Sequence, residues 1–307
     1  MKLKSFSLIK NKRNIFSLST FLLFLSLTGI LVSSFSPDIK MPINLGMDFL
    51  GGNEIRIERK CDALCSEIRS DEIIKNLRNF PNNNLLNNIN FQIQNDNKLI
   101  SIRTPFIPLE QSEELLRNID KFLGPLDYES KSSRSIGPKL GKKLLLNGSL
   151  SLIVSLFAIS IYLSIRFDKK FAILALAALF HDLLIVFGIF SWLGILISVE
   201  VNSLFAVSLL TIAGYSVNDT VVIFDRIREN LKVNNKSKYN QIIELSVNES
   251  LRRTIFTSLT TLIPLITLII FGSYTLFWFS VSLALGIMIG SYSSILLAPS
   301  LLLDENK

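Results

Sequence analysis

The residues of this chain best suited to chemistry are ionisable side chains that lie inside apolar segments. Asp219 follows Asn218 in the stretch GYSVNDTVVIFDRIREN, His181 and Asp182 are adjacent in a second stretch, and Arg253 begins a third. An ionisable group inside a membrane helix costs about 2.5–3.5 kcal/mol or more, so it usually faces the interior of a helix bundle and has a function. Such groups indicate proton handling.

Six apolar segments must position these residues. The mean hydropathy is +0.43, and a membrane helix needs about 20 apolar residues. The first segment follows basic residues, as a signal peptide does, but it is longer than the roughly 7–15 apolar residues of a signal sequence, so a retained span is predicted. The predicted spans are 15–35, 144–165, 171–193, 202–224, 254–271 and 276–301.

The basic residues predict the orientation, because Lys and Arg concentrate on the cytoplasmic side of short loops. They cluster in residues 1–14, in the turn 166–170 and in the loop 225–253, which contains a predicted short interfacial helix, "YNQIIELSVNESLRR". We therefore expect residues 1–14 and the tail 302–307 to be cytoplasmic. The net charge of +7 follows from this topology and does not indicate nucleic-acid binding, although a basic surface facing the membrane or the ribosome stays open.

Residues 36–143 are too long for a simple connection and predict a folded external domain. Their pattern is strand, helix, hairpin, helix, strand, which is the ferredoxin-like order. The expected strands are 53–59, 91–94, 98–104 and 126–130, and the expected helices are 71–80 and 108–124. The fold class is therefore a six-span α-helical membrane protein with an α+β domain between spans one and two. Cys61 and Cys65 lie in that domain and could form a disulfide or stay unpaired.

Asp219 and Arg253 should lie at comparable depth, because the fourth and fifth spans run in opposite directions. Burial favours a protonated carboxyl, whereas a nearby guanidinium favours the carboxylate. A movement of Arg253 could therefore load and unload a proton at Asp219, although a purely structural salt bridge is equally compatible with the sequence. His181 and Asp182 could be a relay or a hydrogen-bonded structural pair.

Gly286 and Gly290 form a G-x-x-x-G pattern that permits close helix contact, and Gly214 is a further candidate for helix packing. The chain has no glycine-rich phosphate loop, no nucleophile elbow and no paired metal ligands. We expect no enzyme activity, no cofactor and no metal site.

Five segments together resemble the SecF family of bacterial protein export. LGMDFLGG at 45–52 is similar to the motif that leads into the family's external domain, with Asp48, Gly51 and Gly52 as its key residues. The other four segments are SIGPKLGKKL at 135–144, HD at 181–182, the stretch at 214–230 and SLRRTIFTSLTTL at 250–262.

This resemblance implies one half of an RND-type transporter, with the other half supplied by a SecD partner. It implies residence in the bacterial inner membrane and use of the proton-motive force to promote late preprotein translocation, after the SecYEG channel and the SecA motor have begun the work. Asp219 and Arg253 match the family's proton-pathway positions, Asn218 beside Asp219 is assigned to the same pathway, and His181 and Asp182 are further candidates. Two alternatives stay open: a half-molecule exporter of a small molecule or lipid, and a non-conducting scaffold for translocon subunits.

Overall fold

The computed structural model describes residues 7–37, 39–61, 90–94, 98–106, 117, 125–233 and 239–303. Two compact units make up the chain. A helical unit contains residues 1–44 and 148–307, and a sheet unit contains residues 45–147.

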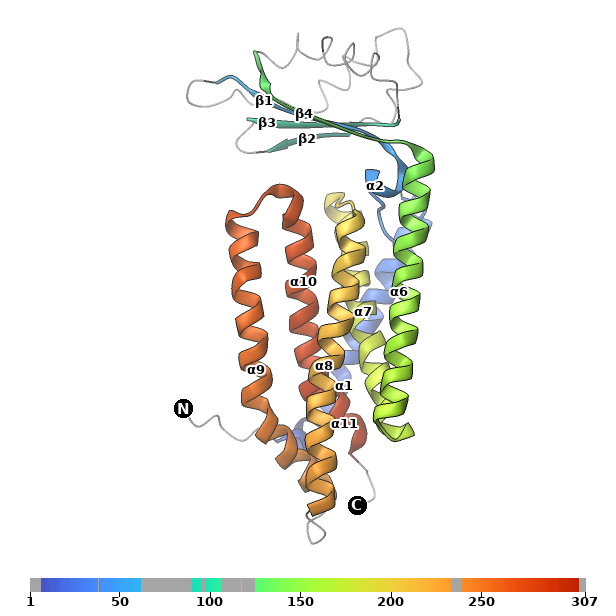
Figure 1. The fold of residues 1–307 in the computed structure, drawn as a ribbon, viewed down its shortest axis with the longest axis vertical. Helices are drawn as coiled ribbons and strands as arrows, with labels where there is room; N and C mark the ends of the chain where they lie inside the picture. The colour runs from blue at the N-terminus through green and yellow to red at the C-terminus, as the bar shows by residue number, and fades with distance from the viewer. Residues whose placement is uncertain are drawn as a thin grey trace. The chain divides into compact units, whose positions relative to one another are not determined.

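Six helices within the described residues are long and apolar enough to cross a membrane, as predicted. Figure 1 shows α7, α8 and α10 beside one another, with contacts between each pair. The last span consists of α10, the π-helical turn η1 and α11. The bounds are α1 (Leu8–Phe35), α6 (Pro138–Arg166), α7 (Lys169–Ile197), α8 (Ser203–Val233), α9 (Tyr239–Phe271), α10 (Tyr274–Tyr292), η1 (Ser293–Leu297) and α11 (Ala298–Leu302).

The helices extend beyond the apolar stretches that predicted them. The segment FDRIRENLK continues α8 to Val233, as expected. The prediction of a separate short interfacial helix in 239–253 is wrong, because α9 runs without a break from Tyr239 to Phe271. No Gly or Pro separates the polar and apolar parts of this segment, and Leu and Arg at the junction favour a helix, so nothing ends the first turns.

The spans differ in how much of their surface this chain buries. More than half of the apolar window is buried in α7, α8 and the last span. Only 22% of the window of α1 and 11% of that of α9 are buried, and no residue of the α6 window is buried within this chain. The centre of the helical unit is therefore built from α7, α8 and the last span.

Helix α1 packs on α7 through two glycines that the sequence analysis did not identify. A Cβ at Gly188 would lie 2.4 Å from the Cα of Ser26, and a Cβ at Gly29 would lie 2.5 Å from the Trp192 ring. The Trp192 indole N–H donates a 2.8 Å hydrogen bond to the Leu25 carbonyl. Small residues thus let the two backbones approach closely, as in other membrane helix pairs.

The sheet unit contains four antiparallel strands in the order β2-β3-β1-β4. This is the order expected for the ferredoxin-like pattern. The fourth strand extends to residue 136, beyond the predicted 126–130. The predicted helices at 71–80 and 108–124 lie outside the described residues, apart from Arg117. The bounds are α2 (Met47–Leu50), β1 (Gly52–Arg59), β2 (Asn90–Gln94), β3 (Leu99–Thr104) and β4 (Leu126–Ile136).

Glu54 is a buried carboxylate in the sheet that is paired directly with cations. Arg103 Nε lies 2.8 Å from Glu54 Oε1, Arg56 Nη2 lies 3.1 Å from Oε2, and Ser101 donates to Oε1. Burial raises the pKa of Glu54, but the two arginines outweigh burial and hold that pKa below its ordinary value.

The motif at 45–52 has a structural role within the sheet unit. Asp48 is buried and forms an ion pair with Arg134 at 3.3 Å. Gly51 has a φ of 79° and Gly52 a φ of 148°, a region that side chains disfavour. A Cβ at Gly52 would also lie 2.6 Å from the Thr104 carbonyl oxygen. Cys61 is disulfide-bonded, and Cys65, the only other cysteine in the sequence, lies outside the described residues.

Candidate proton site in the helix bundle

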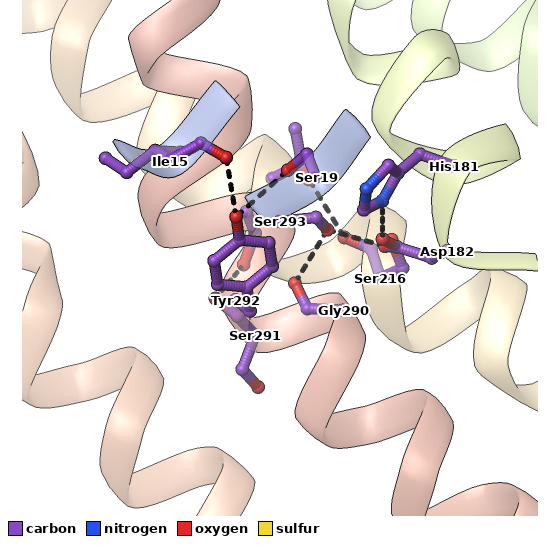
Figure 2. Close-up of polar contacts among 11 residues, drawn as sticks. Ile15, Ser19, His181, Asp182, Ser216, Gly290, Ser291, Tyr292 and Ser293 are labelled. Carbon is purple, nitrogen blue, oxygen red and sulfur yellow. Dashed lines mark hydrogen bonds and ion pairs between the residues drawn. The ribbon is translucent and has the colours of Figure 1, made fainter. Parts of the chain in front are cut away.

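Asp182 on α7 is the centre of a buried hydrogen-bond cluster (Figure 2). Its side chain is fully buried. Ser216 of α8 and Ser293 of the last span each donate to Asp182 Oδ2 at 2.6 Å. His181 Nδ1 lies 2.9 Å from Asp182 Oδ1, a hydrogen bond when the imidazole proton is on Nδ1. Both carboxylate oxygens are therefore occupied, and three helical segments meet at one side chain.

The last span changes its helical geometry at this cluster. Ser293 is the first residue of the π-helical turn η1, and π-helical turns occur frequently at functional sites. Tyr292, the residue before it, donates to the Ile15 carbonyl of α1 at 3.0 Å and accepts from Ser19 at 2.9 Å. Figure 2 shows these contacts beside those of Asp182. Two successive residues thus connect the last span to α1, α7 and α8.

Gly286 and Gly290 place α10 against α8. A Cβ at Gly286 would lie 2.3 Å from the side chain of Ile212. A Cβ at Gly290 would lie 3.3 Å from Ser216 Cβ and 3.6 Å from Asp182 Oδ2. The G-x-x-x-G pattern therefore packs inside this chain and borders the Asp182 cluster.

Asp219 lies on α8, three residues after Ser216, in a different environment. It is buried, and its Oδ2 has no hydrogen-bond partner among the described residues. Arg253 of α9 is exposed and attracts Asp219 electrostatically, but the two side chains do not form a direct ion pair within the described part of the chain. The pairing that the sequence suggested is thus an interaction at a distance in this conformation.

Asn218 and Gly214 face away from the rest of this chain. Both are exposed, and a Cβ at Gly214 would meet nothing within 4 Å. Gly214 therefore takes no part in helix packing inside the chain. Together with Val207 and Thr211 they form an exposed stripe along one face of α8.

The polar residues of the FDRIREN segment join α8 to its neighbours. Arg226 Nε lies 2.7 Å from Glu249 Oε2 on α9, and Asn230 donates to the same oxygen at 2.9 Å. Asp225 pairs with Arg166 at the end of α6. These contacts hold the extended ends of α8 and α9 together, a role that the sequence alone did not indicate.

No group of three or more His, Cys, Asp or Glu side chains within the described ranges is placed to hold a metal ion. His181 has a second ring nitrogen, Nε2, that is buried and has no partner among the same residues. Among the described residues of the bundle, two titratable side chains therefore have a buried atom without a hydrogen-bond partner, His181 at Nε2 and Asp219 at Oδ2.

Comparison with known proteins identifies the family. The family model "Protein export membrane protein SecD/SecF, C-terminal" matches residues 115–307. The protein translocase subunit SecF of Prochlorococcus marinus is 46% identical over 303 residues, covering 97% of this chain and 94% of that protein. SecF of Synechocystis is 38% identical over 277 residues, with 89% and 87% covered.

A solved structure supports the same conclusion for the fold. The crystal structure of SecDF, a translocon-associated membrane protein from Thermus thermophilus, superposes with a TM-score of 0.80 at 28% identity. The match covers 97% of this chain and 38% of that longer chain. With its six spans, sheet unit and matching relatives, the chain is a multi-pass membrane protein that belongs to the SecF family of protein translocase subunits.

Proposed function

We propose that this chain uses the proton-motive force, together with a SecD partner, to promote late preprotein translocation. The observation that carries the proposal is the state of Asp219. Its carboxylate is buried in a span, one of its oxygens has no partner among the described residues, and Arg253 attracts it without touching it. A buried acid with a spare oxygen and a cation nearby is suited to bind and release a proton.

The proposed cycle alternates between two arrangements of Asp219 and Arg253. Low dielectric surroundings favour the neutral acid while the guanidinium is at a distance, and close approach of the guanidinium favours the carboxylate. Arg253 stays charged throughout, so Asp219 is the group that carries the proton. Moving one elementary charge through 100 mV supplies about 2.3 kcal/mol, which can bias a two-state conformational equilibrium.

The exposed stripe on α8 supports a membrane partner. Thr211, Gly214 and Asn218 are exposed at positions inside an apolar span, and α9 also has exposed threonines, such as Thr257. An amide facing lipid is unfavourable, and small residues permit close helix approach. A SecD partner would cover this stripe and enclose the space between Asp219 and Arg253. The SecDF chain from Thermus thermophilus is long enough to contain a second half, since this chain spans 38% of it.

The basic residues support the proposed orientation in a bacterial inner membrane. With residues 1–14, the loop 225–253 and the tail 302–307 in the cytoplasm, the external domain predicted for residues 36–143 lies outside. There it could contact preproteins that emerge from the SecYEG channel after SecA has driven the first part of their transport.

The test is export of a secreted reporter into energised vesicles that contain this chain and a SecD partner. After ATP-driven initiation, the gain from a proton gradient is compared among the wild type, Asp219→Asn and Asp168→Asn. Asp168 is an exposed carboxylate before α7 and serves as the matched control. We expect the wild type and Asp168→Asn to gain from the gradient, and Asp219→Asn to assemble but not to gain. An equal gain in all three would reject Asp219 as the carrier and favour a passive scaffold.

A further inference from the structure

The Asp182 cluster has a property that a purely structural cluster does not need: it can accept one more proton without leaving a donor unpaired. We propose that the His181–Asp182 pair is a second proton-binding site, and that Ser293 reverses its hydrogen bond when the pair takes up a proton. This inference rests on the proposed proton-driven function and assigns a second, internal position to the same pathway.

With Asp182 ionised, the cluster is well hydrogen-bonded but carries an uncompensated charge. Ser216 and Ser293 donate to Oδ2, and a neutral His181 donates from Nδ1 to Oδ1. His181 is the only possible ion-pair partner of Asp182 within the described residues. A buried carboxylate with only neutral donors is costly, so addition of one proton to the pair is favoured.

The added proton has two possible positions, and they differ in how well they are satisfied. On His181 Nε2 it would create a buried N–H group that has no partner among the described residues. On Asp182 Oδ2 it can be donated to Ser293 Oγ, which already lies at 2.6 Å. Ser293 then needs another acceptor for its own hydrogen. The Gly290 carbonyl oxygen lies 3.1 Å from Ser293 Oγ and can accept it.

Proton uptake therefore reverses one hydroxyl group. One proton enters, an O–H bond forms at Asp182 Oδ2, and the Ser293 hydroxyl rotates from Asp182 toward Gly290. Ser216 can still donate to Oδ2, because a protonated carboxyl oxygen retains acceptor capacity. The backbone does not have to move to form the protonated state. His181 stays neutral in this state, so its Nε2 carries no hydrogen that would need an acceptor.

The reversal affects the last span, because Ser293 is where the π-helical turn begins. In the ionised state, the Ser293 hydroxyl is a donor that ties the last span to α7. In the protonated state, this hydroxyl bonds within its own span, to Gly290. The neighbouring contacts of Tyr292 with Ile15 and Ser19 are unaffected. Proton uptake thus alters how the last span is held against α7 while α1 stays attached.

Among the residues labelled in Figure 2, the only titratable side chain besides the His181–Asp182 pair is Tyr292 of α10, whose hydroxyl bonds to Ile15 and Ser19 of α1. On α8, Asp219 follows Ser216 by three residues. Ser216 and Asp219 are three residues apart and so are neighbours on one side of α8. Ser216 is therefore the side chain through which the two acids can influence one another.

Infrared difference spectroscopy of the complete SecD–SecF complex, recorded between acidic and alkaline pH, tests the proposal directly. We expect a protonated-carboxyl C=O stretching band that titrates, disappears in Asp182→Asn and persists in Asp219→Asn. The band should shift to higher frequency in Ser293→Ala, which removes the acceptor of the Asp182 hydroxyl. A folded Asp182→Asn complex that retains every titrating carboxyl band would overturn the proposal.

If Asp182→Asn does not assemble, Asp182→Glu and Ser293→Ala carry the test. The band should move in both, and an unmoved band in both would likewise reject the site. A functional readout separates this proposal from the first one. Ser293→Ala should shift the pH profile of gradient-driven export, whereas Ser191→Ala, which removes a buried hydroxyl bonded to Pro42, should not. Unchanged profiles in both variants would count against a role of Ser293 in proton uptake.

The two proposals can fail separately. If Asp219→Asn exports with full gain from the gradient while the Asp182 band titrates as expected, the proposed function fails and the second proton-binding site stands. If Asp219→Asn loses the gain but no Asp182 band exists, the proposed function stands and the Asp182 cluster is structural.

Discussion

Asp182 and Asp219 are two carboxylates of one helix bundle with opposite surroundings. Both are buried, at 0% and 3% exposure. Asp182 is held by donors from three helical segments, whereas Asp219 Oδ2 has no partner among the described residues. The difference shows that burial alone does not define a proton carrier. Both oxygens of Asp182 already accept hydrogen bonds, so it can exchange a proton only with the side chains that it contacts. Asp219 has an oxygen without a partner, which can accept a proton from a new donor.

The helix packing around Asp182 is also closer than the packing on the exposed face of α8. Around Asp182, glycines bring α8 and α10 into close contact. On the other face of α8, beyond Asp219, Gly214 meets nothing and Asn218 is exposed. One side of α8 is therefore packed within this chain, and the other is exposed in the described part of this chain.

The largest expected effect comes from removing the two carboxylates in turn. Asp182→Ala leaves the buried donors of His181 and Ser216 unpaired, while Ser293 can turn to the Gly290 carbonyl, and should destabilise the chain by about 3 kcal/mol or more. Asp219→Ala removes a buried carboxylate that has a spare oxygen, so its stability should change by less than about 1 kcal/mol. Thermal unfolding of the detergent-solubilised chain measures both. Equal destabilisation by the two variants would remove the distinction between the two sites.

The next effect concerns the two sides of α8. Gly286→Ala forces a methyl group onto Ile212 and should cost about 1–3 kcal/mol. Gly214→Ala meets open space and gains helix propensity, so stability should stay the same or rise by up to about 1 kcal/mol. The two melting temperatures of the isolated chain should therefore move in opposite directions or by clearly different amounts. A destabilised Gly214→Ala chain would mean that this face is packed within the chain after all.

Glu54 of the sheet unit is a third buried acid to compare with Asp182 and Asp219, because it is paired directly with cations. Its pKa is lower in the folded chain than the ordinary value of 4.5, so its ion pairs stabilise the sheet above that value. This stabilisation should be lost as the pH falls through the lower folded pKa. Hydrogen exchange of β1 and β3 amides should show the loss in the wild type. Glu54→Gln should cost about 1–3 kcal/mol near neutral pH and remove most of the acid dependence. An acid dependence that persists in Glu54→Gln would assign it to another group.

The smallest expected effect concerns the contact between α1 and α7. Trp192→Phe removes the hydrogen bond to the Leu25 carbonyl and should cost about 0.5–1.5 kcal/mol, measured by thermal unfolding. Trp278→Phe is a suitable comparison, because Trp278 packs edge-on against Phe190 in the same bundle. A Trp192→Phe variant with wild-type stability would show that the close glycine contacts alone attach α1.

Much of the architecture could be predicted from the sequence. Apolar length predicts the six spans, and alternation predicts the strands around Glu54 and Ile102, because both patterns follow from local geometry. The continuity of α9 was missed because the polar turn around Arg252 and Arg253 looked like a helix boundary, although these residues also favour helices.

The partners of Asp182 could not be predicted in the same way. Ser216 and Ser293 are 34 and 111 residues away along the chain, and helical periodicity indicates a face but not the residue opposite. A π-helical turn has no clear sequence signal either. The serines next to Gly290 were the one visible hint, because hydroxyl groups beside a packing glycine lie close to the facing helix.

Proton flux through the reconstituted SecD–SecF complex tests the central claim most directly. Proteoliposomes with an imposed membrane potential and an internal pH-sensitive dye would compare the wild type with Asp219→Asn at equal amounts of assembled complex. Our account predicts potential-driven proton movement in the wild type and none above the lipid background in Asp219→Asn. Equal flux in the two would contradict the assignment of Asp219 as the proton carrier.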